Sequence, residues 1–215
     1  VLLLVVAAAV FALTRGGKDE APQAGNLLVN GDFSAVTDGM PDGWSTGMWV
    51  TSAGASYLEA VTLADGTTAA LVENAASNDA RFEQTVAVRE NTTYKLTARV
   101  MAENCGEEHK GANVSFSGIY GTSADLHDTD GQWETLTLYG RTGKGQKEVT
   151  VMVRLGGYGS ENTGKAWFTD VRLEQVETVP VGETVLDLAT PAPSKKTDTS
   201  EPKTARNMSI PLLIG

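Results

Sequence analysis

Residues 92–104 read TTYKLTARVMAEN, and this stretch decides the fold class. Its apolar side chains recur at every second position, so that Tyr94, Leu96, Ala98 and Val100 share one face of an extended chain. Lysine, threonine and arginine alternate with them and fall on the opposite face. A helix would need a period of about 3.6 residues, whereas a half-buried strand has a period of two. The stretch therefore predicts a β-strand with one face in a core.

The same pattern continues outward from this strand. Residues 148–155, EVTVMVRL, place valines and a leucine on one face. Similar β-branched or aromatic runs occupy 57–64, 67–74, 80–88, 112–119 and 132–140, and turn-forming residues separate them. No amphipathic helix pattern occurs from 27 to 175. About nine short strands of this kind predict an all-β, two-sheet antiparallel sandwich.

Composition limits the classes of partner. The chain has 215 residues and a formal net charge of -10, without a basic stripe, so no nucleic acid partner is expected. Its one cysteine, Cys105, cannot form an internal disulfide. Neighbouring Glu103, Glu107 and Glu108 would raise its pKa. We predict an unreactive free thiol in or beside a loop.

The flanks differ from the central region. Residues 1–15 contain VLLLVVAAAVFAL, which predicts a truncated N-terminal transmembrane helix or a signal-peptide remnant. Residues 16–25 read as a linker, and 177–207 as a disordered stalk rich in Pro, Thr, Ser and Lys. Within the stalk, ETVLDL (183–188) is either an added strand or has no fixed structure. Residues 208–215 indicate the start of a second apolar segment.

These flanks predict a domain that is extracytoplasmic and membrane-anchored, or alternatively secreted. The basic residues beside both apolar segments would by themselves favour the cytoplasm. This rule weakens for long translocated domains, and the family resemblance described next outweighs it.

Five features follow one another in order: NLLVNGDF, PDGW, the run from 80 to 104, GQWETLTLYG and AWFTDVRLEQ. This order resembles the cellulase-associated carbohydrate-binding modules of the family 4/9 type, in the galactose-binding-like β-jelly-roll group. The resemblance covers residues 26–176. It implies a monomeric jelly-roll domain that binds a glycan or polysaccharide. It also implies that Phe33 and Trp44 are core residues that anchor the two sides of a loop.

The resemblance further implies a structural calcium ion near the ends of the domain. The matching positions are Asp32, in the loop after the first strand, and Asp170, in the last strand. Ser34 and Thr169 stand where many relatives carry further carboxylates. Carbonyl groups and water would have to supply the missing oxygen ligands. The alternative is that Asp32 caps a turn and Asp170 lies at a strand edge.

Aromatic rings are the main tools for recognising a sugar, because a ring stacks on the apolar C–H face of a pyranose. The candidates outside the expected core are Trp49, Tyr57, Tyr120, Tyr158 and Trp167. Each could instead pack against its own sheet or loop. Trp44, Tyr94 and Trp133 are assigned to the core.

Catalytic motifs are missing from the sequence. It contains no G-x-S-x-G, no H-E-x-x-H and no complete P-loop, and no pair of carboxylates stands out. In ADLHDTDGQW, Asp125, His127, Asp128 and Asp130 form either a solvated turn or an ion site. His109 is expected in a loop.

Three classes of function remain. The first is a non-catalytic glycan-binding module. The second is a structural or protein-interaction domain of a larger membrane protein, such as a transporter or glycosyltransferase. The third, an enzyme in its own right, has the least support from the sequence.

Overall fold

The computed structural model describes residues 25–189. The predicted helix (1–15), most of the first linker, the later part of the stalk and the segment 208–215 lie outside these residues. Within 25–189, no helix is long and apolar enough to cross a membrane.

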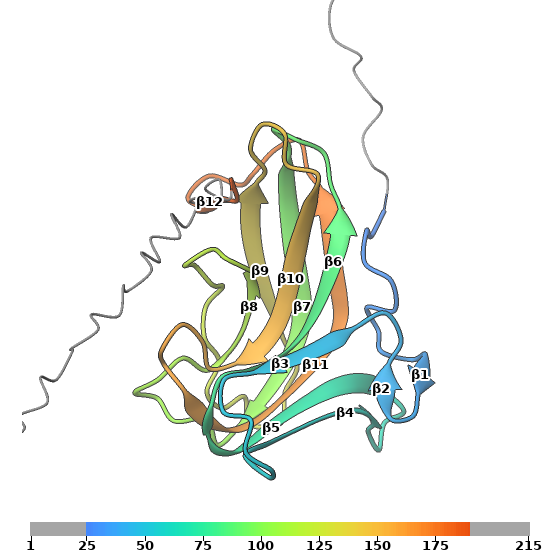
Figure 1. Cartoon of the computed structure of the whole chain (residues 1–215), viewed down its shortest axis with the longest axis vertical. Helices are drawn as coiled ribbons and strands as arrows, with labels where there is room; N and C mark the ends of the chain where they lie inside the picture. Colours follow the sequence, from blue (N-terminus) through green and yellow to red (C-terminus); the bar gives the residue numbers. More distant parts are fainter. Residues whose placement is uncertain (1–24, 190–215) are drawn as a thin grey trace, which may run out of the picture.

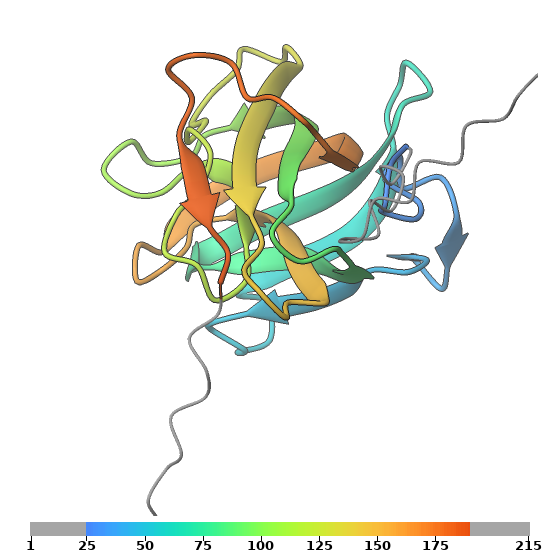
Figure 2. The same cartoon turned by 90° about the horizontal axis from the view of Figure 1, so that it is seen from above.

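The described chain forms two β-sheets that face each other (Figures 1 and 2). The four-stranded sheet has the order β3 (Ser45–Met48), β6 (Ala80–Ala87), β10 (Glu148–Leu155), β8 (Ala112–Phe116). The six-stranded sheet has the order β12 (Val185–Asp187), β9 (Glu134–Arg141), β7 (Thr93–Glu103), β11 (Asn162–Gln175), β5 (Thr68–Asn78), β4 (Ser56–Thr62). A small ribbon joins β1 (Val36–Thr37) and β2 (Met40–Pro41). All strand pairs are antiparallel except β12 with β9, which confirms the predicted all-β jelly-roll sandwich.

The core lies between the two sheets and follows the predicted alternation. On β7, Tyr94, Leu96, Ala98 and Val100 are fully buried. The valines of β10 face them from the other sheet and are buried as well. Burial of this apolar surface is the main source of stability for a domain without disulfides.

The loop before β3 is held by the two aromatic residues that the resemblance placed there. Phe33 and Trp44 are buried with ring centroids 5.0 Å apart, and the indole of Trp44 donates to the carbonyl of Asn30 at 3.1 Å. Asn30, Phe33 and Asp38 adopt positive φ angles. Asn30 also donates from its amide to the carbonyls of Ala35 and Asp42. The Gly, Asp and Asn residues here therefore serve a tightly turned loop.

The assignment of Trp133 to the core is wrong. Trp133 is half-buried at the surface, and the guanidinium carbon of Arg99 lies 5.3 Å from its ring centroid. The ring precedes β9 and finds a cation–π partner on the outside of the sheet instead of a place between the sheets.

The folded part continues past the predicted boundary at 176. β12 pairs in parallel with β9, and Leu188 is buried in the core. The backbone N–H of Leu188 donates to the carbonyl of Arg141 at 2.8 Å. Of the two alternatives for ETVLDL, the added strand is therefore the one observed.

Candidate functional site

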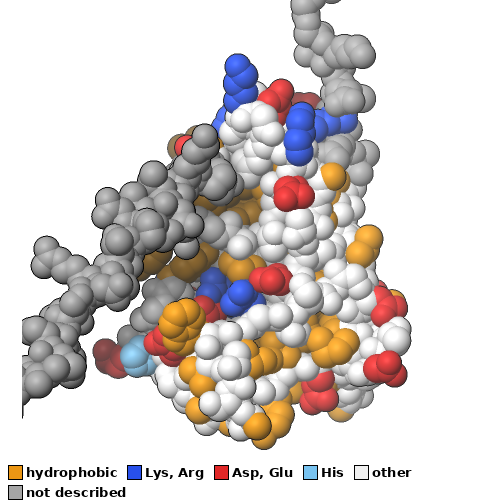
Figure 3. Space-filling view, viewed as in Figure 1, with side chains coloured by type: hydrophobic (Ala, Val, Ile, Leu, Met, Phe, Trp, Pro, Cys, Tyr) orange, Lys and Arg blue, Asp and Glu red, His pale blue; other side chains and the backbone are white. Residues whose placement is uncertain are grey.

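A hollow of about 320 Å³ opens on the outer face of the four-stranded sheet. Its floor is made by Arg81 of β6 and by Met152 and Arg154 of β10. These three point outward because their neighbours Phe82 and Val153 point into the core. Figure 3 shows charged side chains of both signs near the middle of this face, with hydrophobic side chains beside them.

A buried ion pair lies at the base of the hollow. The guanidinium of Arg154 donates through Nε to Asp79 Oδ1 at 3.1 Å and through Nη2 to Asp79 Oδ2. The Arg154 side chain is 3% exposed and that of Asp79 is 13% exposed. A two-point pair of this kind fixes the position of both groups and cancels their charges.

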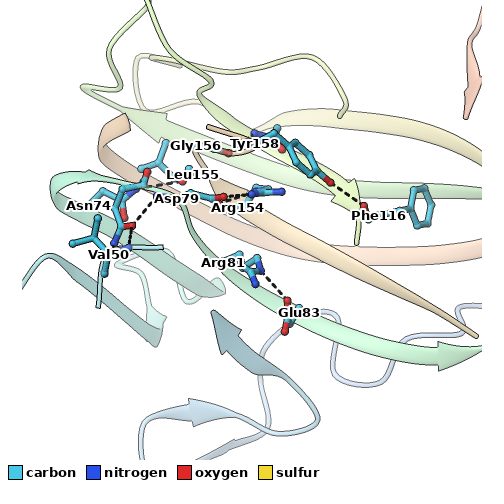
Figure 4. Close-up of polar contacts among 12 residues, drawn as sticks. Val50, Asn74, Asp79, Arg81, Glu83, Phe116, Arg154, Leu155, Gly156 and Tyr158 are labelled. Carbon is cyan, nitrogen blue, oxygen red and sulfur yellow. Dashed lines mark hydrogen bonds and ion pairs between the residues drawn. The ribbon is translucent and has the colours of Figure 1, made fainter. Parts of the chain in front are cut away.

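The same guanidinium supports an aromatic wall. Its carbon lies 4.6 Å from the ring centroid of Tyr158, whose hydroxyl donates to the carbonyl of Phe116 at 3.0 Å (Figure 4). The ring of Tyr120 lies against Tyr158 with centroids 5.3 Å apart. Tyr120 itself is 83% exposed. One side of the hollow is thus Tyr158, which is held by Arg154 and flanked by Tyr120.

Trp49 stands on another side of the hollow and is 75% exposed. Its position is fixed through the backbone. Its own N–H donates to the carbonyl of Asp79 at 2.9 Å. The side-chain amide of buried Asn78 accepts from Val50 N–H at 2.7 Å and donates to Val50 C=O at 2.9 Å. The exposed ring of Trp49 therefore projects toward solvent from a backbone that is fixed.

A second buried asparagine holds the turn that carries Asp79. The amide of Asn74 donates to the carbonyls of Asn78, Leu155 and Asn162 at 3.0–3.3 Å. These bonds join the ends of β5, β10 and β11 at one corner of the sandwich. Asn74 is therefore a positioning residue for the ion pair, although it does not line the hollow.

Three of the five predicted aromatic residues lie at the hollow, and two lie elsewhere. Trp49 and Tyr158 line the hollow and Tyr120 contacts Tyr158. Tyr57 and Trp167 do not join them: both lie on strands of the six-stranded sheet, and Trp167 pairs there with Leu71 and Met101.

Sequence reasoning missed the polar part of the site. Asp79, Arg81, Arg154 and Glu161 all contact the hollow and were not among the candidates. A signal existed for Arg154, because the alternating Val149, Val151, Val153 and Leu155 of EVTVMVRL share the inner face, so that Arg154 must point to the outer face. The partner of Arg154 had no signal, because Asp79 lies 75 positions earlier.

The segments that carry the two predicted calcium positions are adjacent. The N–H of Val171 donates to the carbonyl of Gly31 at 2.8 Å, so the loop of Asp32 lies along β11, the strand of Asp170. However, Asp170 pairs with Arg99 at 3.2 Å, and Asp32 accepts from the N–H and hydroxyl of Ser34. No three His, Cys, Asp or Glu side chains gather for a metal within 25–189. The residues present fit calcium poorly, since an arginine occupies one carboxylate, and the ion remains a prediction.

The other candidates have local structural roles. Asp128 accepts from the N–H groups of Asp130 and Asn104, and these bonds lower the pKa of its carboxyl. A ring nitrogen of His127 lies 2.8 Å from the carbonyl of His109. These contacts favour a hydrogen-bonded turn over an ion site. Burial raises the pKa of the Cys105 thiol to about 11, with a smaller contribution from nearby carboxylates.

No family model and no curated protein sequence matches the chain. Among solved structures, the enzymatically active domain of tailspike protein 4 from bacteriophage CBA120 aligns with 70% of this chain at 10% identity and a TM-score of 0.51. The aligned part spans only 21% of that tailspike chain.

Two carbohydrate-binding modules align over nearly their whole length. TmCBM61, solved with β-1,4-galactotriose, matches 70% of this chain and 99% of its own, with 16% identity and a TM-score of 0.47. A family 4 module matches 68% and 98%, with 19% identity and a TM-score of 0.45. The predicted two-sheet jelly-roll sandwich is confirmed by the strand order of the structure itself. Family 4/9 is not singled out.

Proposed function

We propose that this domain is a non-catalytic module that binds a neutral glycan in the hollow above β6 and β10. The observation that carries the proposal is the aromatic lining of the hollow: Trp49 stands largely in solvent beside a fixed polar floor, and Tyr158 lines the hollow with the exposed ring of Tyr120 packed against it. Apolar rings that line a hollow together with a few polar groups are the usual setting of a small-ligand site.

The hollow offers both parts of a sugar's surface a partner. The rings of Trp49 and Tyr158 present apolar faces for stacking against pyranose C–H groups. Around them, the Arg81 guanidinium and the Glu161 carboxylate are placed to hydrogen-bond hydroxyls. Arg81 does not have to move far, because Glu83 already holds its guanidinium at 2.8 Å.

The charges support a neutral ligand. Asp79 balances the charge of Arg154, and Glu83 balances that of Arg81. Glu161 adds a negative charge to the same hollow. A uronic acid or a phosphorylated sugar would meet this carboxylate without an unpaired cation nearby.

The arrangement also supports a binding role without catalysis. Glycoside hydrolysis needs two carboxyl groups about 5–10 Å apart across the bond, one of them able to carry a proton. In the hollow, Asp79 is committed to Arg154, which leaves Glu161 without a second carboxylate among the residues that line it. Display of the module outside a membrane, anchored through its flanks, rests on the sequence of residues 1–15 and 208–215 and is part of the same proposal.

A second candidate function is a structural or protein-interaction domain. The observation that favours it is the outer face of the six-stranded sheet, where Trp133, Trp167 and Met101 are half-buried. Half-exposed tryptophan and methionine side chains are typical of the centre of a protein–protein interface.

Isothermal titration of residues 25–189 against a panel of soluble neutral glycans tests the proposal. We expect heat from at least one glycan with the native protein, and none with Trp49→Ala at the same concentrations. The matched control is Trp167→Ala, which removes the same side chain from the opposite sheet. Lack of binding across the panel, with the fold verified by circular dichroism, would reject the proposal in favour of the second candidate.

A further inference from the structure

A second hollow, of about 360 Å³, lies between the outermost strands of the two sheets. Thr46 and Met48 of β3, which ends the four-stranded sheet, line one side of it. Residues 56–59 of β4, which ends the six-stranded sheet, line the other side. None of its residues lines the hollow above β6 and β10, so it is a separate feature of the surface.

The floor of this hollow is apolar. Met40, Met48 and Leu58 line it and pack against the hydrophobic core. In the strand pairing, Met48 lies opposite Ala80 and Leu58 lies opposite Val72, and both of these partners are fully buried. Opposite residues of a strand pair point to the same face, so both side chains turn toward the inside of the sandwich. Figure 3 shows hydrophobic side chains at the surface in the region of β3 and β4. The core therefore reaches the surface between the two sheet edges.

The edge of β4 offers backbone groups to a further strand. In an antiparallel pair, the N–H and C=O groups of every second residue point away from the partner strand. Ala60 has this orientation, because its N–H donates to the carbonyl of Gly39, outside the sheet, at 3.0 Å. Leu58, two residues earlier, has the same orientation and lies at the hollow, where the described chain places no strand beyond β4. β4 also contains neither proline nor lysine, two residues that commonly block a sheet edge.

The edge of β3 has the same property on the other side of the hollow. The N–H of Trp49 donates to the carbonyl of Asp79, on the side of β6, so the backbone groups of Met48 point the other way. An apolar floor thus lies between two edges that carry available donors and acceptors. An extended peptide adds to a sheet in this setting, with its backbone on the edge and alternate side chains in a pocket.

The charge around the hollow limits the kind of partner. Residues 25–80 contain seven aspartates and glutamates and no lysine or arginine. Asp79 and Glu73 pair with cations from later strands. Glu59, which lines the hollow, and Asp38, in the adjoining β1–β2 ribbon, are exposed and have no ion pair within the part of the chain that the structure describes. A basic segment is attracted to this region, whereas a second copy of the chain would bring the same acids and be repelled.

We infer that the hollow between β3 and β4 binds an extended segment of a basic partner protein, in which lysine or arginine alternates with apolar residues. The segment pairs with the edge of β4. Its apolar side chains enter between Met48 and Leu58, and its basic side chains remain outside, near Glu59. The inference does not depend on glycan binding, because the two hollows share no residue.

The test uses the whole 215-residue chain and an acetylated heptapeptide of alternating lysine and valine, with binding followed by NMR of the backbone amides. We expect the amide signals of Leu58 and Met48 to shift as the peptide is added. Two matched peptides separate the contributions. Glutamate in place of lysine should abolish binding, and serine in place of valine should weaken it at least about fivefold, because the apolar contact is lost.

Variants of the protein locate the binding site. Glu59→Lys should weaken the lysine–valine peptide at least about threefold, because it reverses the charge at the rim and leaves the core intact. Glu134→Lys makes the same change at an exposed position of β9 and is the matched control, with unchanged affinity. Leu58→Lys places a cation on the floor and should abolish binding. If Leu58→Lys does not fold, Glu59→Lys decides the test.

The outcomes separate this inference from the proposed function. Unchanged signals of Leu58 and Met48, or equal affinities of the lysine–valine and lysine–serine peptides, would overturn the inference and leave glycan binding as it stands. A shift of these two signals with a glycan of the panel would also overturn it, because the hollow would then be a sugar site. If the glycan panel fails and the peptide binds as expected, the proposed function fails and this inference stands.

Discussion

The two outer faces of the sandwich carry the same types of residue in different settings. On the four-stranded sheet, Trp49 and Tyr120 project from loops around a hollow and are largely exposed. On the six-stranded sheet, Trp167 lies in the middle of β11, where its cross-strand neighbours are Leu71 and Met101. Trp167 packs on these neighbours and is half-buried, whereas Trp49 is 75% exposed. The comparison of these two tryptophans shows that the surroundings of a ring, and not its presence alone, decide whether it is available to a ligand.

Two arginine–aspartate ion pairs, one on each sheet, also differ in their surroundings. Arg154 is buried and pairs with Asp79 at two points, while Arg99 and Asp170 form a solvated single contact at 3.2 Å. Buried pairs cost much when one partner is removed, and solvated pairs contribute little. The two pairs offer the sharpest test of how the faces differ.

The largest effect is expected for Arg154→Ala. The change leaves the Asp79 carboxylate buried without its partner and removes the support of the Tyr158 ring, so the free energy of unfolding should fall by about 3 kcal/mol. Arg99→Ala should lower it by less than about 1 kcal/mol. Urea denaturation of both variants measures the two values. Similar losses for the two variants would mean that the base of the hollow is solvated and not built as described.

The sequence was sufficient for the sandwich because strand periodicity is local. Every residue of the stretch 92–104 assigned to the buried face is buried, and so are the alternating valines of 148–155. The sequence did not decide whether β12 forms a strand. Its three residues are too few to show a two-residue period, and the strand depends on pairing with β9. Trp133 was wrongly assigned to the core, because a tryptophan next to a strand can pack inward or contact a cation on the outside. The cation here is Arg99, which lies 34 positions earlier in the sequence and gave no local signal.

The site was predictable only in part for a related reason. Trp49 and Tyr158 could be singled out because small residues and glycines surround them in the sequence. Trp167 could not be separated from them, because its half-burial depends on strands that pair from distant parts of the chain. The buried asparagines 74 and 78 gave no sign of their role, since an asparagine near a turn is ordinary until the carbonyls around it are known.

The second-largest effects are expected for alanine variants of the two tryptophans, measured as glycan affinity and unfolding free energy. Trp49→Ala should lower glycan affinity at least tenfold and change stability little, because the exposed ring has few contacts in the free protein. Trp167→Ala should do the reverse, with a loss of about 1–2 kcal/mol in unfolding free energy and unchanged affinity. Titration and urea denaturation of both variants give the four values. An affinity loss confined to Trp167→Ala would move the site to the six-stranded sheet.

A smaller effect is expected for the pH dependence of stability that arises from Cys105. This buried cysteine follows β7, so its reactivity shows whether that end of the six-stranded sheet excludes solvent. Burial raises the pKa of the folded thiol from 9.0 to about 11, so the protonated thiol is the form that favours folding. This contribution is complete below pH 9 and is lost as the pH rises toward 11. We expect about 1 kcal/mol less stability at pH 10 than at pH 8 from this group.

Cys105→Ala provides the control, because other groups also titrate in alkali. The variant should show a weaker pH dependence than the native protein in the same urea experiment. The native thiol should also react with iodoacetamide at pH 8 only when urea unfolds the domain. Rapid reaction in the folded state would show that the end of the sheet opens.

The smallest expected effect is that of calcium on the same sheet. A cation near Asp32 and Asp170 would have to displace Arg99 from Asp170, so millimolar calcium should raise the unfolding free energy of the native domain by less than about 0.5 kcal/mol. Arg99→Ala frees the carboxylate and should increase the calcium response, whereas magnesium should change neither protein because it requires a tighter octahedral set of ligands. Thermal unfolding in calcium, in magnesium and in EGTA measures all three conditions. A stabilisation of several degrees in the native domain would mean that carbonyl oxygens and water complete a site there despite the arginine. In that case the six-stranded sheet would be tied together by an ion, and the four-stranded sheet by the Arg154–Asp79 pair.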